Sequence, residues 1–189
     1  MIDGVEIAAA VRAMPGERAC GDRAVYWRDE DVLLVAVIDG LGHGPHAATA
    51  AEAAVAYVAE HRAESLEQIV TGCDRALRGS RGVVMTLLRL RESTGECWHL
   101  GVGNVEARII GADAPLLTSP GVVGARLRQV RLRSFVLARG VTVILYTDGI
   151  SSRFPIRELQ GLGAEAIVRV LLTEHAKDHD DAGCAVLVT

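Results

Sequence analysis

The sequence predicts an α+β fold in which two sheets pack face to face and helices cover the outside. The first observation is the order of the elements: strands, two helices, several consecutive strands, a helix and a closing strand. Runs of antiparallel-type strands kept apart from helices are typical of layered α+β domains, not of doubly wound ones. The second observation is the run Val32–Ile38, which has no polar side chain and therefore resembles a strand buried on both faces.

The third observation is the size and composition of the chain. With 189 residues, of which 50% are hydrophobic, the chain is long enough to bury one sizeable core. Aromatic residues make up only 4%, so Val, Leu, Ile and Ala must supply that core. No linker, repeat or low-complexity segment is visible, and we expect one domain over residues 1–189.

The N-terminal half of the chain is expected to form strands followed by helices. The first strand is rich in alanine, which also allows a helix there. The acidic turn Arg28–Asp31 separates two strand-forming runs and indicates a hairpin. An alanine-rich run and a second helix-type run, joined by a polar stretch, indicate two helices. The expected elements are the strands Val5–Met14, Ala24–Trp27 and Val32–Ile38 and the helices Pro45–Glu60 and Leu66–Leu77.

The C-terminal half is expected to consist mainly of strands. The turn-forming stretch RESTGE separates the first two of them. The stretch Pro115–Gly124 has two interpretations, the border of a functional site or a simple surface loop. The expected elements are the strands Gly82–Leu90, Cys97–Val102, Val105–Ile110, Arg128–Leu137, Val141–Thr147 and Cys184–Val188 and the helix Ala164–Glu174.

The charge of the chain argues against a nucleic-acid partner. The net charge is -4 and the pI is about 5.9, whereas nucleic-acid binding normally needs a basic stripe. The most basic segment is Ala125–Arg139, in which four arginines alternate with apolar residues: Arg126, Arg128, Arg131 and Arg133. This pattern favours the solvated face of a strand over a binding function.

Cysteine usage and the absence of apolar segments favour a cytoplasmic protein. Cys20, Cys73, Cys97 and Cys184 are widely spaced and form no CxxC pair, which is typical of reduced thiols rather than of a zinc site or a disulfide framework. The N-terminus MIDGVEIAAAVRAM carries acids and no long apolar core, unlike a signal peptide. No run approaches the roughly 18 apolar residues of a membrane span, so we expect no membrane partner.

An acidic residue stands at the end of the most apolar strand. Asp39 and Gly40 end the run Val32–Ile38, and the turn GLGHG then opens an alanine-rich helix. Such a turn can cradle a phosphate or can support a metal-binding carboxylate. The phosphate interpretation is weak, because the turn lacks the Lys-Ser/Thr of a P-loop and the GxGxxG spacing of a dinucleotide fingerprint.

Three further acid-bearing turns repeat this arrangement. Asp22 directly precedes a strand, Asp148 follows one in the sequence YTDG, and Asp180 and Asp181 precede the last strand. A single Asp-Gly pair is typical of an ordinary turn, but strand-end acids can converge on one edge of a sandwich. Several carboxylates gathered there need cations, and oxygen donors suit Mg²⁺ or Mn²⁺. Two such ions can clamp a phosphoryl group and activate a water, so the chemistry indicated is phosphate ester hydrolysis.

Five motifs in this order resemble the metal-dependent protein phosphatase (PPM) family, in its bacterial SpoIIE-like branch. The resemblance covers nearly the whole chain and is most similar to a stressosome phosphatase of that branch. The motifs are CGD at Cys20–Asp22, AVIDGLGHG at Ala36–Gly44, GVGNV at Gly101–Val105, YTDG at Tyr146–Gly149 and DDAGCAVLV at Asp180–Val188.

The resemblance implies a four-layer αββα sandwich of two antiparallel sheets flanked by helices, forming a single phosphatase domain over residues 1–189. It also implies two metal ions, Mn²⁺ or Mg²⁺. Asp39 would bridge both ions, Asp148 and Asp180 would hold one, and Asp22 and the backbone carbonyl of Gly40 would serve the other, partly through water. Asp39, Asp148 and Asp180 would be catalytic through a metal-activated water, without a side-chain nucleophile.

The resemblance further implies a serine/threonine phosphatase that acts on phosphoserine or phosphothreonine in stressosome STAS-domain proteins and resets stress signalling. One alternative is a SpoIIE-like phosphatase of an anti-sigma-factor antagonist. Another is a non-catalytic scaffold that binds phosphoproteins, although such a module has no need of paired metal carboxylates. A nucleotide-binding domain is the third, and the missing lysine disfavours it.

Three positions near the acids differ from the family's core pattern or lie outside it. Leu41 stands where eukaryotic members have a histidine that is thought to protonate the leaving group. His43 lies two residues further on and could act as the general acid, with a solvent proton or a metal-bound water as the alternative. Asp181 would be a neighbour of the ligands rather than a ligand.

Overall fold

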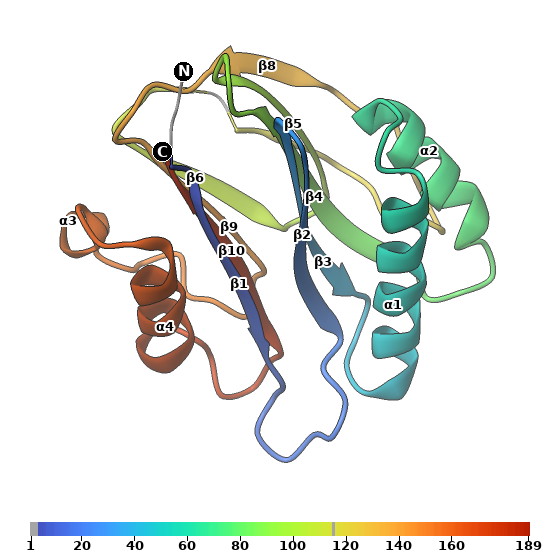
Figure 1. Cartoon of the computed structure of the whole chain (residues 1–189). Helices are drawn as coiled ribbons and strands as arrows, with labels where there is room; N and C mark the ends of the chain where they lie inside the picture. The colour runs from blue at the N-terminus through green and yellow to red at the C-terminus, as the bar shows by residue number, and fades with distance from the viewer. Residues whose placement is uncertain (1–3, 115) are drawn as a thin grey trace.

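A computed structural model describes residues 4–114 and 116–189 and shows four layers (Figure 1). Two sheets lie face to face in the middle, antiparallel except for one short parallel pair between residues 101–102 and residues 118–119, and two helices cover the outer face of each. This is the αββα sandwich expected from the sequence. The strands are β1 Glu6–Arg12, β2 Asp22–Asp29, β3 Val32–Gly40, β4 Val83–Arg91, β5 Glu96–Val102, β6 Glu106–Ile110, β7 Thr118–Ser119, β8 Arg133–Val136, β9 Thr142–Tyr146 and β10 Ala182–Val188.

The first sheet joins the two ends of the chain. Its strand order is β1-β10-β9-β6, and all three pairs are antiparallel. Two helices pack on its outer face, namely α3 (Ile156–Leu159) and α4 (Ala164–Glu174). Because β10 is the last strand and pairs with β1, this sheet is completed only by residues far apart in sequence.

The second sheet has the order β2-β3-β4-β5-β7, and β8 also pairs with β5. Its outer face is covered by α1 (Pro45–Glu60) and α2 (Leu66–Ala76). The start of α2 is closed by a capping box, in which Ser65 and Gln68 each bond the other's backbone N–H through their side chains. The structure thus confirms both helices expected in the N-terminal half.

The apolar strands are buried on both faces, as the sequence of β3 predicts. Leu34, Ala36 and Ile38 pack toward α1 and α2, whereas Leu33, Val35 and Val37 pack between the sheets. Side chains alternate across a strand, so one strand contributes to two of the hydrophobic layers. This double burial explains why β3 lacks polar residues before Asp39.

One predicted strand is wrong over half its length. Residues 128–132 do not pair, and β8 begins only at Arg133, which lies opposite His99 of β5. The short strand β7, which the sequence did not indicate, pairs with β5 at Gly101 and Val102. Because β7 takes this end of the β5 edge, the arginine-rich segment has no edge to join there. The short helix α3 was likewise not expected from the sequence.

Candidate metal centre

The fold brings the four predicted aspartates to one edge of the sandwich. Asp22 opens β2 and lies directly opposite Asp39 in the β2–β3 register. Asp148 follows β9, and Asp180 precedes β10. The charges of Asp22, Asp148 and Asp180 all raise the pKa of Asp39, so the four carboxyl groups are electrostatic neighbours. This edge is at the lower end of Figure 1, where the β1–β2 connection and the start of α1 lie.

Three of these carboxylates line an open cavity of about 430 Å³. Asp39, Asp148 and Asp180 form its acidic part, whereas Asp22 is buried behind them with 2% of its surface exposed. The other lining residues come from the turn after β3, from β4 and from three loops: Leu41, Gly42, His43, Val84, Asn104, Val122 and His179. The cavity is therefore lined by both acidic and apolar side chains, and it is large enough to admit a phosphorylated side chain.

Burial and the charges of neighbouring acids both disfavour the charged forms of Asp22, Asp39 and Asp180. Burial is the main reason that the pKa of Asp39 rises to about 8, and the neighbouring acids raise it further. Burial likewise raises the pKa of Asp22 to about 7, although the hydrogen bond from Thr147 partly offsets this. The pKa of Asp180 is also raised, mainly by burial and then by Asp148. Without cations, this group cannot stay fully ionised at low cost.

Hydrogen bonds fix the orientation of two of the carboxylates. The hydroxyl of Thr147 donates to Oδ2 of Asp22 at 2.6 Å, and the amide of Asn104 donates to Oδ2 of Asp148 at 2.7 Å. The ammonium group of Lys177 donates to the backbone carbonyl of Asp148 at 2.5 Å. Each acid is held by a residue from another strand or loop, so the arrangement depends on the complete fold.

Asp181 connects loops rather than facing the cavity. Its Oδ1 accepts the backbone N–H of Met14 at 2.7 Å, and its Oδ2 accepts that of Gly21 at 2.6 Å. Both oxygens are thus used by the β1–β2 connection. A Cβ atom added to Gly149 would lie 1.7 Å from the backbone oxygen of Asp181, so only glycine fits beside it. Gly149 therefore allows the two acid-bearing loops to approach each other.

Glycines also shape the turn behind Asp39. A Cβ atom on Gly40 would lie 2.2 Å from the carbonyl oxygen of Ala47 in α1, which excludes any other residue without movement of the backbone. Gly42 and Gly44 have φ values of 88° and 76°, in the left-handed region that favours glycine. The turn thereby leads from β3 directly into α1, which begins with Pro45.

The donor set suits a hard divalent cation. Every acid at this edge offers carboxylate oxygen, and Mg²⁺ and Mn²⁺ prefer such oxygen ligands. Among residues 4–114 and 116–189, no three His, Cys, Asp or Glu side chains converge closely enough to hold an ion by themselves. Waters and backbone carbonyls would have to complete the coordination, which is usual for Mg²⁺, because it keeps several waters in protein sites.

Two histidines flank the acids. His43 lies on the cavity wall, and its Nδ1 is 3.4 Å from Oε1 of Glu17, with 66% of the histidine side chain exposed. His179 lines the cavity next to Asp180. Leu41 also lines it and adds apolar surface instead of a proton donor.

Sequence reasoning did not identify several residues that support the site. Asn104 lies in the GVGNV motif, but its bond to Asp148 follows only from the β6–β9 register, which pairs Glu106 with Tyr146. Thr147 precedes the Asp148 motif, and its bond to Asp22 links residues 125 positions apart. The interpretation of residues 115–124 as a border of the site is supported at Val122, while Pro115 lies outside the described residues.

The raised pKa values predict that the metal-free protein loses stability as the pH rises. A carboxyl group whose pKa is raised on folding stabilises the fold while protonated, so this contribution falls between pH 3.8 and about 8 for Asp39. Asp39→Asn removes the buried charge and should increase the free energy of unfolding in EDTA at pH 8 by about 1–3 kcal/mol. Urea unfolding measures the change.

The increase should become smaller at pH 5, where the wild-type carboxyl group is protonated in the folded state. Asp113→Asn, at an exposed acid of the β6–β7 connection, is the matched control and should leave the stability unchanged at both pH values. A less stable Asp39→Asn protein in EDTA, or a difference that does not vary with pH, would contradict this account of the site.

Comparisons with known proteins agree with the motifs. The family model of Stage II sporulation protein E (SpoIIE) matches residues 29–188. The phosphoserine phosphatase RsbX of Bacillus subtilis (strain 168) is 26% identical over 139 residues, which are 72% of this chain and 70% of that protein. These matches confirm the resemblance to the SpoIIE-like branch and to RsbX.

Solved structures agree over almost the full length of the chain. One similar structure comes from a study of the bacterial stressosome as a modular system that has been adapted to control secondary messenger signalling. Its sequence is 34% identical to this chain, the TM-score is 0.92, and the match covers 98% of this chain and 100% of that chain. A crystal structure of RsbX in complex with magnesium has a TM-score of 0.85 and covers 98% of this chain and 94% of that chain. At 23% identity it supports the fold alone. The chain belongs to the SpoIIE family of metal-dependent protein phosphatases.

Proposed function

We propose that this chain hydrolyses phosphoserine or phosphothreonine in a protein substrate with the help of two Mg²⁺ or Mn²⁺ ions at the acidic edge. The observation that carries the proposal is the pair of Asp22 and Asp39, whose pKa values are raised mainly by burial, next to an open cavity that Asp39 lines together with Asp148 and Asp180. A cluster of this kind is costly for a fold unless cations neutralise it. The phosphatase domain is proposed to extend over residues 1–189.

The proposed ligands are divided between the two ions. Asp39 lies between the buried Asp22 and the acids of the cavity, and it would bridge both ions. Asp148 and Asp180 would hold one ion from the cavity side. Asp22 and the backbone carbonyl of Gly40 would serve the other, partly through water. The charges of Asp22, Asp148 and Asp180, which raise the pKa of Asp39 in addition to burial, support this division.

Bound divalent cations supply positive charge for the phosphoryl oxygens and lower the pKa of a water. The chain's own residues prepare the space for this chemistry. Asn104 and Thr147 hold Asp148 and Asp22 in fixed orientations. The apolar side chains of Leu41, Val84 and Val122 line the remaining wall of the cavity.

The proton for the departing serine or threonine oxygen has two proposed sources. His43 lies on the cavity wall beside Glu17, a position from which an imidazolium ion could donate. Water is the alternative source, because the imidazole is largely exposed and the cavity is open. No cysteine, serine or threonine lines the cavity among the described residues, which supports direct attack by water rather than by a side chain.

The proposed substrates are phosphorylated STAS-domain proteins of the stressosome, whose dephosphorylation would reset stress signalling. The phosphoserine phosphatase RsbX and the stressosome chain described above support this assignment. An anti-sigma-factor antagonist is the alternative substrate. The proposed location is the cytoplasm, which the four free cysteines support.

No helix in the described part of the chain is long and apolar enough to cross a membrane.

The first test is hydrolysis of p-nitrophenyl phosphate by the wild type and by Asp39→Asn, each with Mg²⁺, Mn²⁺ or EDTA. We expect turnover only with a metal ion, and we expect the variant to lose at least about 100-fold in kcat, because Asp39 is proposed to hold both ions. Phosphate release from a phosphorylated STAS protein should follow the same pattern. Asp113→Asn is again the control and should retain full activity.

Equal turnover in EDTA and in metal would contradict the proposed chemistry. So would full activity of Asp39→Asn. A folded wild-type protein that is inert toward both substrates with every metal would favour a phosphoprotein-binding scaffold instead.

A second test concerns the positioning of Asp148 by Asn104. Asn104→Ala removes the donor at 2.7 Å and should increase the metal concentration needed for half-maximal activity by about 10–100-fold. The KM for p-nitrophenyl phosphate at saturating metal should change by less than about threefold, because the amide acts on Asp148 and not on the substrate. An unchanged metal requirement would exclude this positioning role.

A further inference from the structure

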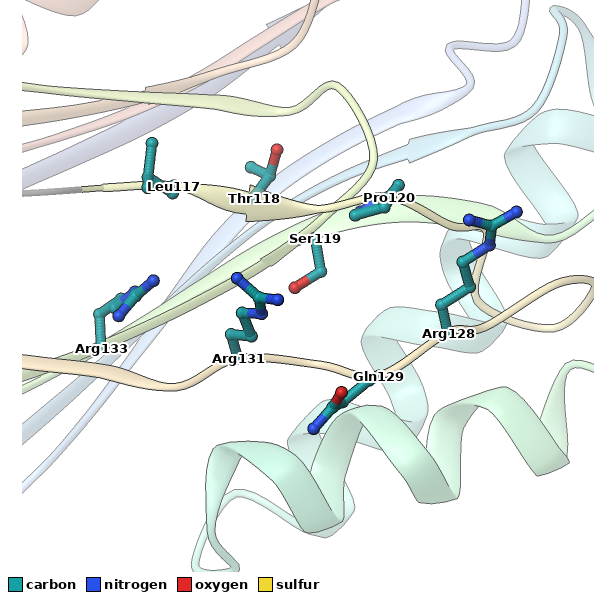
Figure 2. A pocket seen from close by; sticks show the side chains of 8 residues that line it. All are labelled: Leu117, Thr118, Ser119, Pro120, Arg128, Gln129, Arg131 and Arg133. Carbon is teal, nitrogen blue, oxygen red and sulfur yellow. The ribbon is translucent and has the colours of Figure 1, made fainter.

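A second cavity, of about 300 Å³, is lined by Pro120, two residues before Val122 of the metal-centre cavity. We call it the arginine pocket. It lies between the chain around β7 and the segment that leads into β8 (Figure 2). Its lining residues are Leu117, Thr118, Ser119, Pro120, Arg128, Gln129, Arg131 and Arg133. None of the described residues that line it is acidic.

The sheet topology creates this pocket. Strand β5 pairs with β7 at Gly101 and Val102 and with β8 from Glu96 to His99. Residues 128–132 therefore run beside β7 without joining the sheet. In Figure 2 the side chain of Arg131 extends from this segment toward β7, and the hydroxyl of Ser119 points toward it. Gln129 points away, toward the helices.

The positive charges of the pocket have no partner among the residues that the structure describes. Among residues 4–114 and 116–189, no ion pair or side-chain hydrogen bond is made by Arg128, Arg131 or Arg133. The Nε of Arg133 is in addition buried without an acceptor. A buried donor that lacks a partner normally costs free energy. Three cations that share one cavity also repel one another, so an anion bound there would relieve both costs.

The donors in the pocket suit a phosphoryl group. A guanidinium group presents several N–H donors in a planar fork that matches phosphate oxygens, and clustered arginines are a common means of binding phosphorylated groups. Ser119 adds a hydroxyl donor on the opposite wall (Figure 2). A cavity of about 300 Å³ is at the small end of ligand sites, which fits one phosphorylated side chain or one free phosphate ion.

We infer that the arginine pocket is a second anion-binding site, separate from the metal centre, which takes a phosphate monoester or a phosphate ion. The loop 117–133 connects the two sites, because Pro120 lines one cavity and Val122 lines the other. An anion in the pocket therefore lies against the same loop that forms a wall of the metal centre. The assignment of a phosphorylated protein as the source of the anion rests on the proposed function. The binding of an anion in the pocket does not depend on that function.

Binding is tested in EDTA, where the metal centre is acidic and repels anions. The probes are inorganic phosphate and a short phosphoserine peptide, with the unphosphorylated peptide and a glutamate-for-phosphoserine peptide as comparisons. The proteins are the wild type, the double variant Arg128→Gln/Arg131→Gln and the control Arg157→Gln, an exposed arginine of α3. Affinities come from calorimetry, and amide chemical shifts in NMR spectra locate the site in the wild type.

We expect saturable binding of the phosphorylated probes by the wild type and the control, and at least tenfold weaker binding by the double variant. Shifts should concentrate at residues 117–120 and 128–133. Tighter binding of the peptide than of phosphate would identify a phosphorylated protein as the source, and the reverse would identify free phosphate. Both outcomes support the site.

Equal affinity in the double variant, no saturable binding, or shifts confined to Asp39–His43 would overturn the inference. Equal binding of the glutamate peptide would overturn the phosphate assignment in favour of acidic peptides in general. Because the NMR result needs only the wild type, a variant that failed to fold would still leave the inference testable. The result is also independent of turnover, so failure of the arginine pocket and failure of the proposed phosphatase chemistry can be told apart.

Discussion

The free-energy cost of burying several carboxylates close together at one edge of the sandwich is the constraint on which the rest of the site depends. The register of β2 and β3 places Asp22 directly opposite Asp39, and like charges in opposed positions destabilise a sheet. Burial makes the larger contribution to this cost and is the main reason that the pKa of both groups is raised. A fold that retains such a pair gives up stability, and cations bound between the acids would recover it. The same carboxylates that destabilise the metal-free protein would therefore favour the binding of cations.

The surrounding structure holds this edge together from several directions. Asp181 links the β1–β2 connection to the start of β10, and Thr147 links the end of β9 to Asp22. These bonds cross between the two sheets, which otherwise contact each other mainly through apolar side chains. The polar cross-links therefore lie where the hydrophobic layer between the sheets ends. A rigid scaffold on either side keeps the acids close together in spite of their repulsion.

Much of the fold could be predicted from the sequence. The unbroken apolar run of β3, the helix-forming run of α1 and the turn residues between strands predicted two sheets packed face to face with helices outside, because each reports a local preference or a burial pattern. The family resemblance added the four-layer αββα order. The errors arose where pairing is decided elsewhere. Residues 128–132 have the composition of a strand, but β7 occupies the edge that they would need. Two-residue strands and one-turn helices leave too few residues for a periodic signal.

The candidate site was only partly visible in the sequence. Acids at strand ends are recognisable, since the strands themselves are, and this identified Asp39 and Asp148. The hydrogen-bond partners of Asp148 and Asp22 cannot be recognised in the sequence. Asn104 and Thr147 reach these carboxylates only through the pairing of strands in the fold. The arginines between Ala125 and Arg139 show the same limit. Their spacing resembled a solvated strand face, whereas three of them face a common cavity in the fold.

The most direct measurement for the central claim is anomalous X-ray diffraction from crystals of this protein soaked in Mn²⁺. We predict two anomalous peaks at the acidic edge, one next to Asp148 and Asp180 and one next to Asp22, with Asp39 in contact with both. Absence of any peak between these aspartates at saturating Mn²⁺, in crystals whose fold is intact, would contradict the proposal that the carboxylate cluster is a two-metal centre.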